Sequence, residues 1–325
     1  MYLNKKKIFL AGATGLVGTS IIQHILQYCP TTKIRAIYNK TPPFVKHERV
    51  EYIQADLKYH QDCRQAVKGC DCAIMAAAST GGSLQLEQEP WQQVNNNLIM
   101  NAQMFEAFYF EKISRVIFIG SATIYQEFDN SIKEHELDLN KDPHMAYFGI
   151  AHVVRYLEKL SQFWHEYSGL EVINVRASNI FGPHSKFDPK TSNFIPAIIR
   201  KAVNRLEPFE VWGSPDVTRD VIYSEDFAKA IIMILNKTNI KFDVFNIGSG
   251  TKTTVGDVVN WSLKYSDHIS ATVKYVSDKP TTIKFRSLDC SKAKNVLGWI
   301  PEHSIEEGVK KTTQWWIKNQ SWWKK

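Results

Sequence analysis

The sequence predicts an α/β fold: a doubly wound, Rossmann-type parallel sheet joined to a smaller, discontinuous C-terminal substrate domain. Over the first half of the chain, short apolar segments alternate with amphipathic segments of helical length, which is typical of repeated strand–helix units. Segments such as Val116–Ile119 are apolar at every position, as strands covered by helices on both faces are. A glycine-rich turn follows the first of these strands.

The strands that we expect follow one another at regular spacing. In chain order they are residues 7–11, 33–39, 50–57, 72–78, 115–125 and 170–183. Helical periodicity predicts helices that end near Tyr28, that cover residues 91–110, and that open within Asp142–Leu160. Beyond Pro183 the pattern weakens, with short strands expected at 209–215 and 271–277. Residues 220–235 contain an apolar helix that is expected to return to the main domain.

Composition indicates an ordinary globular protein. The 325 residues are 44% hydrophobic and 22% charged, and no apolar run approaches the roughly 20 residues of a membrane span. The basic start is followed by a short glycine-rich segment, which indicates a first strand rather than a signal peptide, so a cytoplasmic location is expected. The five cysteines show no metal-ligand spacing, so we expect reduced, mostly buried thiols and no metal site.

The net charge of +7 and the pI near 9.0 are compatible with an anionic partner. Lysine and arginine are scattered rather than grouped, which argues against a nucleic-acid-binding stripe. A phosphate-bearing small molecule needs only a few of these cations. The C-terminal stretch "QWWIKNQSWWKK" could lie at a membrane interface or could close the core of the small domain, and we favour the second interpretation.

The turn after the first strand has the spacing of a dinucleotide-binding loop. Glycines permit a tight turn and let the backbone approach a pyrophosphate, while the following helix N-terminus offers N–H groups and a positive dipole end. The residues expected to surround the pyrophosphate are Gly12, Thr14, Gly15, Leu16, Val17 and Gly18.

The end of the second strand favours NADP, with NAD as the alternative. NAD-binding folds usually place a carboxylate there for the ribose hydroxyl, but this chain has Arg35, Asn39 and Lys40. A cation could hold the extra phosphate of NADP, whereas Asn39 could hydrogen-bond a plain ribose. Asp56 and Leu57, after the third strand, are placed to bracket the adenine. After the fourth strand, small side chains allow close passage of the cofactor, at Ala76, Ala77 and Ala78.

Together these segments resemble the extended short-chain dehydrogenase/reductase family (the NAD-dependent epimerases and dehydratases) over nearly the whole chain. The resemblance rests on "FLAGATGLVG", "AAASTGG", "FIGSATIY", "NIFGPHSKFD", "NFIPAIIRK", "VWGSPDVTRD" and "NIGSG". Within the family, the later segments are most similar to the GDP-L-fucose synthases. The resemblance implies that residues 1–178 plus about 216–250 bind the dinucleotide. It also implies that about 179–215 plus 251–325 bind a nucleotide-diphosphate sugar.

The same resemblance implies roles for individual residues. Ser121 and Tyr147 match the family's catalytic serine and tyrosine, and Asn97 and His152 fall on the cofactor side. The residues expected to line the sugar nucleotide are Thr123, Asn179, Asn193, Lys201, Trp212, Arg219 and Arg286.

One residue of the family pattern is missing. The lysine that should follow the catalytic tyrosine by four residues, on the same helix face, is Ala151. In a second register Phe148 replaces the tyrosine and His152 the lysine, and two or three residues are inserted at this helix start. Tyr147 is therefore expected to be displaced along the helix, with His152 or Arg155 as a substitute cation.

Two further departures concern epimerisation. The positions of the family's base and acid hold Thr123 and Asn193, neither of which titrates near neutral pH. We therefore expect an NAD(P)-dependent 4-ketoreductase or 4-dehydrogenase of a nucleotide sugar, by resemblance a GDP-sugar, without epimerase activity. The alternative is a catalytically weak or silent binding homologue with a regulatory or partner role. Family members commonly pair through helices that correspond to about 97–110 and 145–167, which predicts a homodimer.

Overall fold

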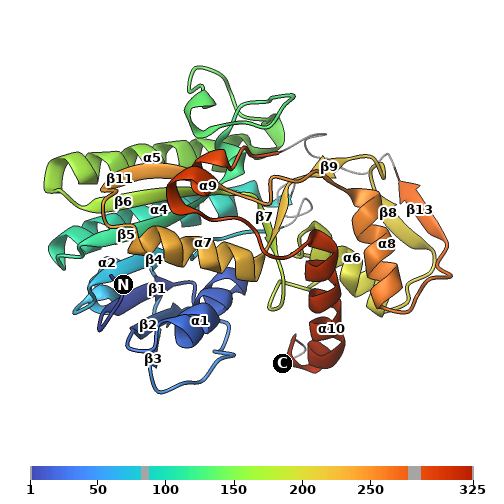
Figure 1. Ribbon diagram of the computed structural model, residues 1–325, viewed down its shortest axis with the longest axis horizontal. Helices are drawn as coiled ribbons and strands as arrows, with labels where there is room; N and C mark the ends of the chain where they lie inside the picture. Colours follow the sequence, from blue (N-terminus) through green and yellow to red (C-terminus); the bar gives the residue numbers. More distant parts are fainter. Residues whose placement is uncertain (1, 82–87, 277–286, 324–325) are drawn as a thin grey trace.

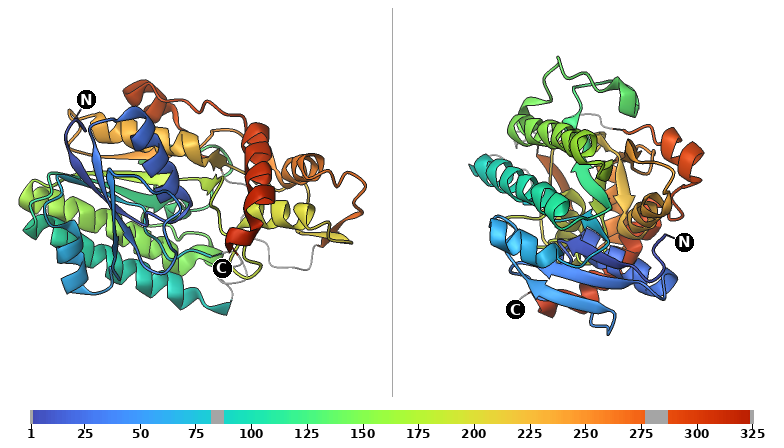
Figure 2. Two further views of the ribbon diagram at one scale, coloured as in Figure 1. Left: turned by 90° about the horizontal axis from the view of Figure 1, so that it is seen from below. Right: turned by 90° about the vertical axis from the view of Figure 1, so that its left-hand side faces the viewer.

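The computed structural model describes residues 2–81, 88–276 and 287–323. They form two lobes, a large sheet covered by helices on both faces and a smaller lobe at the carboxyl ends of its strands (Figure 1). Viewed from the end of the sheet, helices lie on either side of it (Figure 2, right). This confirms the predicted α/β class with a parallel sheet.

All neighbouring strands of the seven-stranded sheet are parallel, in the order β11-β6-β5-β4-β1-β2-β3. Because β1 lies between β4 and β2, the loops that leave these three strands are neighbours at the carboxyl edge. The strands are β1 (Lys7–Ala11), β2 (Lys33–Tyr38), β3 (Val50–Gln54), β4 (Cys72–Met75), β5 (Arg115–Ser121), β6 (Glu171–Ala177) and β11 (Phe242–Ile247).

Each face of the sheet has its own apolar core. Helices α1 (Leu16–Tyr28), α7 (Ser224–Asn236) and α9 (Ser291–Leu297) pack on one face, where Ile21, Phe227 and Trp299 are buried. Helices α2 (His60–Val67), α4 (Pro90–Phe110) and α5 (Phe148–Ser168) cover the other face. These helices therefore bury against the sheet the apolar faces that their sequence periodicity predicts.

The small lobe has a third core. It is formed by α6 (Phe194–Val203), β8 (Phe209–Trp212), α8 (Val255–Tyr265), β13 (Val273–Val276) and α10 (Ile305–Trp323). Strands β8 and β13 pair in parallel. Two short pairs join the lobes, β7 (Asn179–Phe181) with β10 (Val221–Tyr223) and β9 (Thr218–Arg219) with β12 (Thr253–Thr254).

Three local features differ from the sequence expectations. The strand expected over 115–125 ends at Ser121 and continues as a 3-10 turn, Ala122–Ile124. The segment 170–183 forms two strands, because β7 leaves the large sheet to pair with β10. The chain also returns to the large lobe after residue 287, since Trp299 is buried in the core beside α1 and α7.

The aromatic C-terminal segment helps to close the small lobe. Trp316 is buried and stacks on Phe187, with their ring centroids 4.0 Å apart. Among the described residues, no helix combines the length and the hydrophobicity needed to cross a membrane. All five cysteines are free thiols, and four of them are buried.

Candidate cofactor and substrate site

The glycine loop at the end of β1 is shaped by close backbone contacts. Gly12 has φ of +72°, and a Cβ atom built on it would lie 2.6 Å from the Ala76 carbonyl oxygen and 2.7 Å from Ala77 Cα. A Cβ on Gly18 would lie 2.2 Å from the Gly12 carbonyl oxygen. Side chains at these two positions are therefore excluded, and the backbone of β1 runs directly beside the alanines that follow β4.

The N-terminus of α1 points out of this loop without a side-chain cap. Gly15 is the N-cap residue, and no side chain accepts a hydrogen bond from the first turn. Leu16 and Val17 open the helix, and the first turn holds no carboxylate. This end of the helix can therefore donate backbone N–H groups to an anion, which fits a dinucleotide pyrophosphate.

Of the three cofactor residues predicted from β2 and its end, two lie at the carboxyl edge of the sheet. Asn39 and Lys40 are exposed just beyond the strand, and the Asn39 carbonyl accepts a hydrogen bond from Gln54 Nε2 at 2.7 Å. The described residues place no carboxylate within ion-pair distance of Lys40. Its ammonium group can therefore meet a phosphate at the carboxyl edge.

Arg35 does not fit the role predicted for it. Its guanidinium pairs with Glu51 at 3.1 Å and donates to the Lys68 carbonyl at 2.5 Å, just past the C-terminus of α2. Because α2 runs back from the carboxyl edge, these partners lie near the opposite edge of the sheet. The expectation that Arg35 holds the NADP phosphate is therefore wrong, since strand alternation and Glu51 direct it elsewhere.

The remaining cofactor-side residues are held by neighbouring loops. The Asp56 carboxylate accepts the Lys58 N–H at 3.2 Å, and Leu57 is buried. Asn97, buried on α4, receives the Ser79 N–H at 2.8 Å and donates to the Ser79 carbonyl at 3.0 Å. Asn97 thus fixes the loop that follows Ala78, rather than offering its own amide to a ligand.

Ser121 ends β5 and caps the following 3-10 turn. Its hydroxyl accepts a hydrogen bond from the Thr123 N–H at 3.2 Å. The Thr123 hydroxyl is shielded from solvent, and no described residue forms a hydrogen bond with it. Two hydroxyl groups therefore lie together at the carboxyl end of the central strand.

The face of α5 that covers this strand end is apolar. A Cβ built on Gly120 would lie 3.3 Å from Val154 Cγ1, and Val154 packs in one cluster with Ala122 and Ile124. Ile150, one turn earlier, packs against the same cluster. Ile150 and Val154, which lie four residues apart on the face of α5 next to Ser121, are therefore both apolar and carry no titratable group.

Tyr147 lies before α5 rather than within it. Met145–Tyr147 form a 3-10 turn, and the Ala146 N–H donates a hydrogen bond to His144 Nδ1 at 3.1 Å. Tyr147 is the N-cap residue of α5 and is partly buried, 6.2 Å in ring-centroid distance from His144. Tyr147 thus belongs to a short turn that precedes the helix.

The contacts of His152 and Arg155, the two residues expected to replace the missing lysine, lead away from Ser121. His152 Nε2 lies 3.4 Å from Asp142 Oδ1, and its ring packs edge-on against Phe148 at 4.6 Å. Arg155 donates to the carbonyl of Ile124 at 2.8 Å and to that of Lys141 at 2.8 Å. These contacts hold both cations against the segment before α5.

The predicted substrate residues line the small lobe and its junction. Asn179 and Asn193 are exposed at the start of β7 and at the N-cap of α6. Lys201 donates to the Glu210 carbonyl at 2.8 Å, and partial burial lowers its pKa. Trp212 is exposed on β8, and Arg219 donates to the Thr218 carbonyl. Arg286 lies outside the described residues.

One contact across the junction was missed by sequence reasoning. Lys186, from the segment after β7, donates to the Thr80 carbonyl at 2.8 Å and lies 3.4 Å from its hydroxyl. His184, two residues earlier, is buried between Phe44 and Trp315, at 4.2 Å and 4.6 Å between ring centroids. The quoted motif "GPHSKFD" contained both residues, but nothing local identified their partners.

A buried polar network beneath the site was missed as well. Arg176 on β6 forms two hydrogen bonds with the Glu158 carboxylate, at 2.9 Å and 2.8 Å, and donates to Tyr125 Oη at 2.8 Å. Burial raises the pKa of Asp220 to about 6, while its carboxylate accepts the N–H groups of Ser249 and Leu288. These contacts tie the junction strands to the large sheet.

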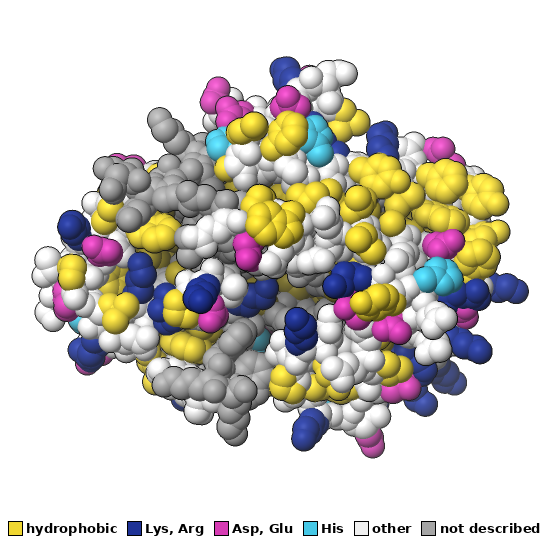
Figure 3. Space-filling model, turned by 180° about the vertical axis from the view of Figure 1, so that it is seen from behind, with side chains coloured by type: hydrophobic (Ala, Val, Ile, Leu, Met, Phe, Trp, Pro, Cys, Tyr) yellow, Lys and Arg dark blue, Asp and Glu magenta, His cyan; other side chains and the backbone are white. Residues whose placement is uncertain are grey.

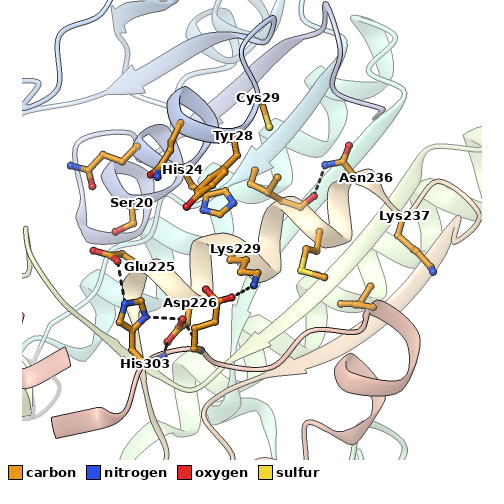
Figure 4. Close-up of a pocket in the computed structure, with 16 residues that line it drawn as sticks. Ser20, His24, Tyr28, Cys29, Glu225, Asp226, Lys229, Asn236, Lys237 and His303 are labelled. Atoms are coloured by element: carbon orange, nitrogen blue, oxygen red, sulfur yellow. Dashed lines mark hydrogen bonds and ion pairs between the residues drawn. The ribbon is translucent and has the colours of Figure 1, made fainter. Parts of the chain in front are cut away.

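A pocket of about 1060 Å³ lies elsewhere, between α1 and α7 (Figure 4). Its polar side chains are largely paired with one another, as in the contacts of His303 with Asp226 at 3.0 Å and of Lys229 with Glu302 at 2.5 Å. No residue predicted for the cofactor or the substrate lines it. The pocket is therefore separate from the candidate site at the carboxyl edge.

Comparison with known proteins agrees with this geometry. The family model described as the NAD dependent epimerase/dehydratase family matches residues 8–248. GDP-L-fucose synthase of Sinorhizobium fredii is 28% identical over 326 residues, which cover 98% of each chain. GDP-L-colitose synthase of Yersinia pseudotuberculosis is 25% identical, covering 97% of this chain and 99% of the relative.

Among solved structures, the fold is similar to that of UDP-glucuronic acid 4-epimerase from Bacillus cereus in complex with UDP-glucuronic acid and NAD. The TM-score is 0.82 at 22% identity, and the match covers 97% of this chain and 99% of that chain. This likeness shows that the two-lobed fold is shared.

Proposed function

The chain belongs to the NAD-dependent epimerase/dehydratase family, and on that premise we propose that it is a nucleotide-sugar oxidoreductase acting at the sugar's C4 position. It would reduce a 4-keto group or oxidise a 4-hydroxyl group with NADP, or with NAD, and would not epimerise the neighbouring carbons. The GDP-sugar relatives favour a GDP-linked substrate.

The observation that carries this proposal is the glycine cradle at the end of β1. Gly12 and Gly18 leave no room for side chains, and the uncapped N-terminus of α1 offers donors to a pyrophosphate. Lys40 would bind the extra phosphate of NADP. The bound nicotinamide would supply or accept the hydride.

The remaining acid–base residue is Tyr147. Its phenol can donate or accept a proton on the sugar oxygen, while the Ser121 hydroxyl hydrogen-bonds the same oxygen. The two substitute cations make their contacts with other groups, Arg155 with the Ile124 and Lys141 carbonyls and His152 with Asp142. We therefore propose a slow reaction rather than a fast one.

Epimerisation needs a base and an acid beside the ketone. Thr123 and Asn193 stand where the family resemblance implies these groups, and neither side chain exchanges a proton readily near neutral pH. The Thr123 hydroxyl is shielded from solvent within the described residues and would line the sugar site as a hydrogen-bonding group. This supports hydride transfer at C4 without inversion at the adjacent carbons.

A second candidate function follows from the apolar face of α5. Ile150 and Val154 lie beside the end of β5, so the helix presents no proton-transfer pair there. If Tyr147 does not reach the sugar, the protein would bind the dinucleotide and the sugar nucleotide with little or no turnover. Its role would then be regulatory or that of a partner in a sugar pathway.

We also propose that two copies pair through the outer faces of α4 and α5. Exposed aromatic rings gather there (Figure 3, right), including Tyr109, Phe110, Phe163 and Tyr167. Phe163 and Tyr167 stack at 5.5 Å, and Tyr109 lies 5.8 Å from Tyr167. An apolar patch of this kind is typical of an interface.

The experiment that tests the proposed function mixes purified protein with a GDP-4-keto-6-deoxy sugar and NADPH and follows NADPH absorbance. Loss of absorbance supports the reductase. Tight binding of both ligands without loss of absorbance at high protein concentration supports the second candidate instead.

A further inference from the structure

Residues 182–187, which we term the bridge segment, cross from the small lobe to two loops of the large lobe. The segment follows β7 and contains two buried aromatic anchors, His184 and Phe187. His184 packs against Phe44, which follows β2, and Lys186 hydrogen-bonds Thr80, which follows β4. Its two contacts with the large lobe therefore lie on loops that leave different strands.

Sheet order places the glycine loop between these two contact points. Strand β1 lies between β2 and β4, so the loop that begins at Gly12 leaves the sheet between the loops that carry Phe44 and Thr80. The close approach of Gly12 to Ala76 confirms that the glycine loop and the β4 loop are adjacent. The two contact points of the bridge segment therefore lie on the loops that flank the glycine loop in the order of the sheet.

The backbone around Lys186 is held on both sides. Phe187 stacks on Trp316 with ring centroids 4.0 Å apart and an interplanar angle of 10°, and His184 is packed between two rings. The partner loop is held too, since Asn97 forms two hydrogen bonds with Ser79. The ammonium of Lys186 is thus the adjustable part of an otherwise fixed contact.

The present partners of this ammonium are both neutral. They are the carbonyl and the hydroxyl oxygen of Thr80, and no carboxylate of the described residues lies within ion-pair distance. The Lys186 side chain is exposed at this contact, like that of Lys190, and contact with the surrounding protein lowers its pKa by desolvation. A charged ammonium with only neutral partners gains free energy when an anion binds beside it.

We propose that the Lys186 ammonium is a ligand of a diphosphate group bound beneath the bridge segment. The diphosphate is either the pyrophosphate of the dinucleotide or the diphosphate of the sugar nucleotide, because both molecules carry the same anionic group. The inference rests on the proposed function, since it requires that at least one of these molecules binds at the carboxyl edge.

The test measures binding of NADPH and, separately, of GDP to wild-type protein and to Lys186→Met, by calorimetric titration. We expect Lys186→Met to weaken one of the two probes about tenfold, the loss of one charge-assisted hydrogen bond. Lys186→Arg should retain most of the affinity. Lys190→Met is the matched control, because it removes an exposed charge four residues away, and it should change neither affinity more than twofold.

The outcomes are distinct. Weaker NADPH binding alone assigns Lys186 to the dinucleotide, and weaker GDP binding alone assigns it to the sugar nucleotide. If wild-type protein binds either probe and Lys186→Met binds both with unchanged affinity and unchanged melting temperature, the inference is overturned while the proposed function stands. If wild-type protein binds neither probe, the proposed function is overturned, and this inference with it.

Discussion

Val154 of α5 packs against Gly120, the residue before Ser121, with only 3.3 Å between Val154 Cγ1 and a Cβ built on Gly120. An apolar methyl group thus occupies the helix face beside the catalytic serine predicted from the sequence. Family resemblance implies a tyrosine and a lysine four residues apart in this region, at positions 147 and 151 or 148 and 152, whereas the helix face beside Gly120 carries Ile150 and Val154. The reaction, if it proceeds, depends on a tyrosine that lies before the helix.

Tyr147→Phe should lower the rate of NADPH oxidation by about 10²–10⁴-fold, since the variant loses the only phenol proposed to exchange a proton with the sugar oxygen. NADPH affinity should stay within twofold of wild type. Tyr156→Phe is the control, because Tyr156 is an exposed tyrosine within α5. Steady-state kinetics of both variants checks this, and full activity in Tyr147→Phe would show that another residue transfers the proton.

Gly12→Ala should destabilise the protein more than Gly69→Ala and should remove dinucleotide binding. Both glycines have φ near +70°, so each alanine costs about 1–2 kcal/mol in the free energy of unfolding. Only the Cβ at position 12 also meets the Ala76 carbonyl, whereas nothing lies within 4 Å at position 69. Chemical denaturation and NADPH titration measure the difference. Equal effects of the two variants would contradict the close approach.

Lys40→Ala should weaken NADPH binding about tenfold and leave NADH binding unchanged, because only NADPH carries the phosphate proposed to meet this cation. Arg35→Ala should not change the ratio of the two affinities, since Arg35 pairs with Glu51 instead. Fluorescence titration of both variants with NADPH and with NADH measures these affinities. A wild-type protein that prefers NADH would refute the role given to Lys40.

Phe163→Glu should convert the proposed dimer to a monomer. A carboxylate among the exposed rings of α4 and α5 would have to be desolvated at the interface. Ile269→Glu, at a more exposed apolar position of the small lobe, should leave the mass unchanged. Light scattering after size exclusion gives the masses, and a monomeric wild type would exclude this pairing.

His184 should make the protein less stable in mild acid. Burial between Phe44 and Trp315 lowers the pKa of His184 to about 4, below the 6.5 of an unperturbed histidine. Between these two pH values the unfolded chain therefore binds more protons than the folded chain. The free energy of unfolding falls as the pH drops from 6.5 towards 4, by about 1.4 kcal/mol per pH unit at most.

His184→Asn removes this titration and tolerates the positive φ of the position. The variant should show a smaller loss of melting temperature between pH 6.5 and pH 4 than wild type. His135→Asn, an exposed histidine, should keep the wild-type slope. An unchanged slope in His184→Asn would mean that other groups dominate the acid response.

Local sequence signals predicted the strands, the glycine loop and the helices, because each depends on residues close together in the chain. Periodicity could not locate the start of α5, since Met145–Tyr147 form a separate 3-10 turn before it. The contact between Lys186 and Thr80 spans 106 residues, and no local pattern marks it. Arg35 was misjudged because its partners, Glu51 and the end of α2, are brought together only by the fold.

The central claim is hydride transfer at C4 without epimerisation, and its most direct test is a single-turnover reaction in deuterated water. Excess protein is mixed with NADPH and a GDP-4-keto-6-deoxy sugar, and the product is analysed by mass spectrometry and NMR. We expect consumption of NADPH and a 4-hydroxy product that carries no solvent deuterium on the carbons beside C4. Unchanged NADPH in the presence of bound sugar nucleotide, or deuterium on those carbons, would contradict it.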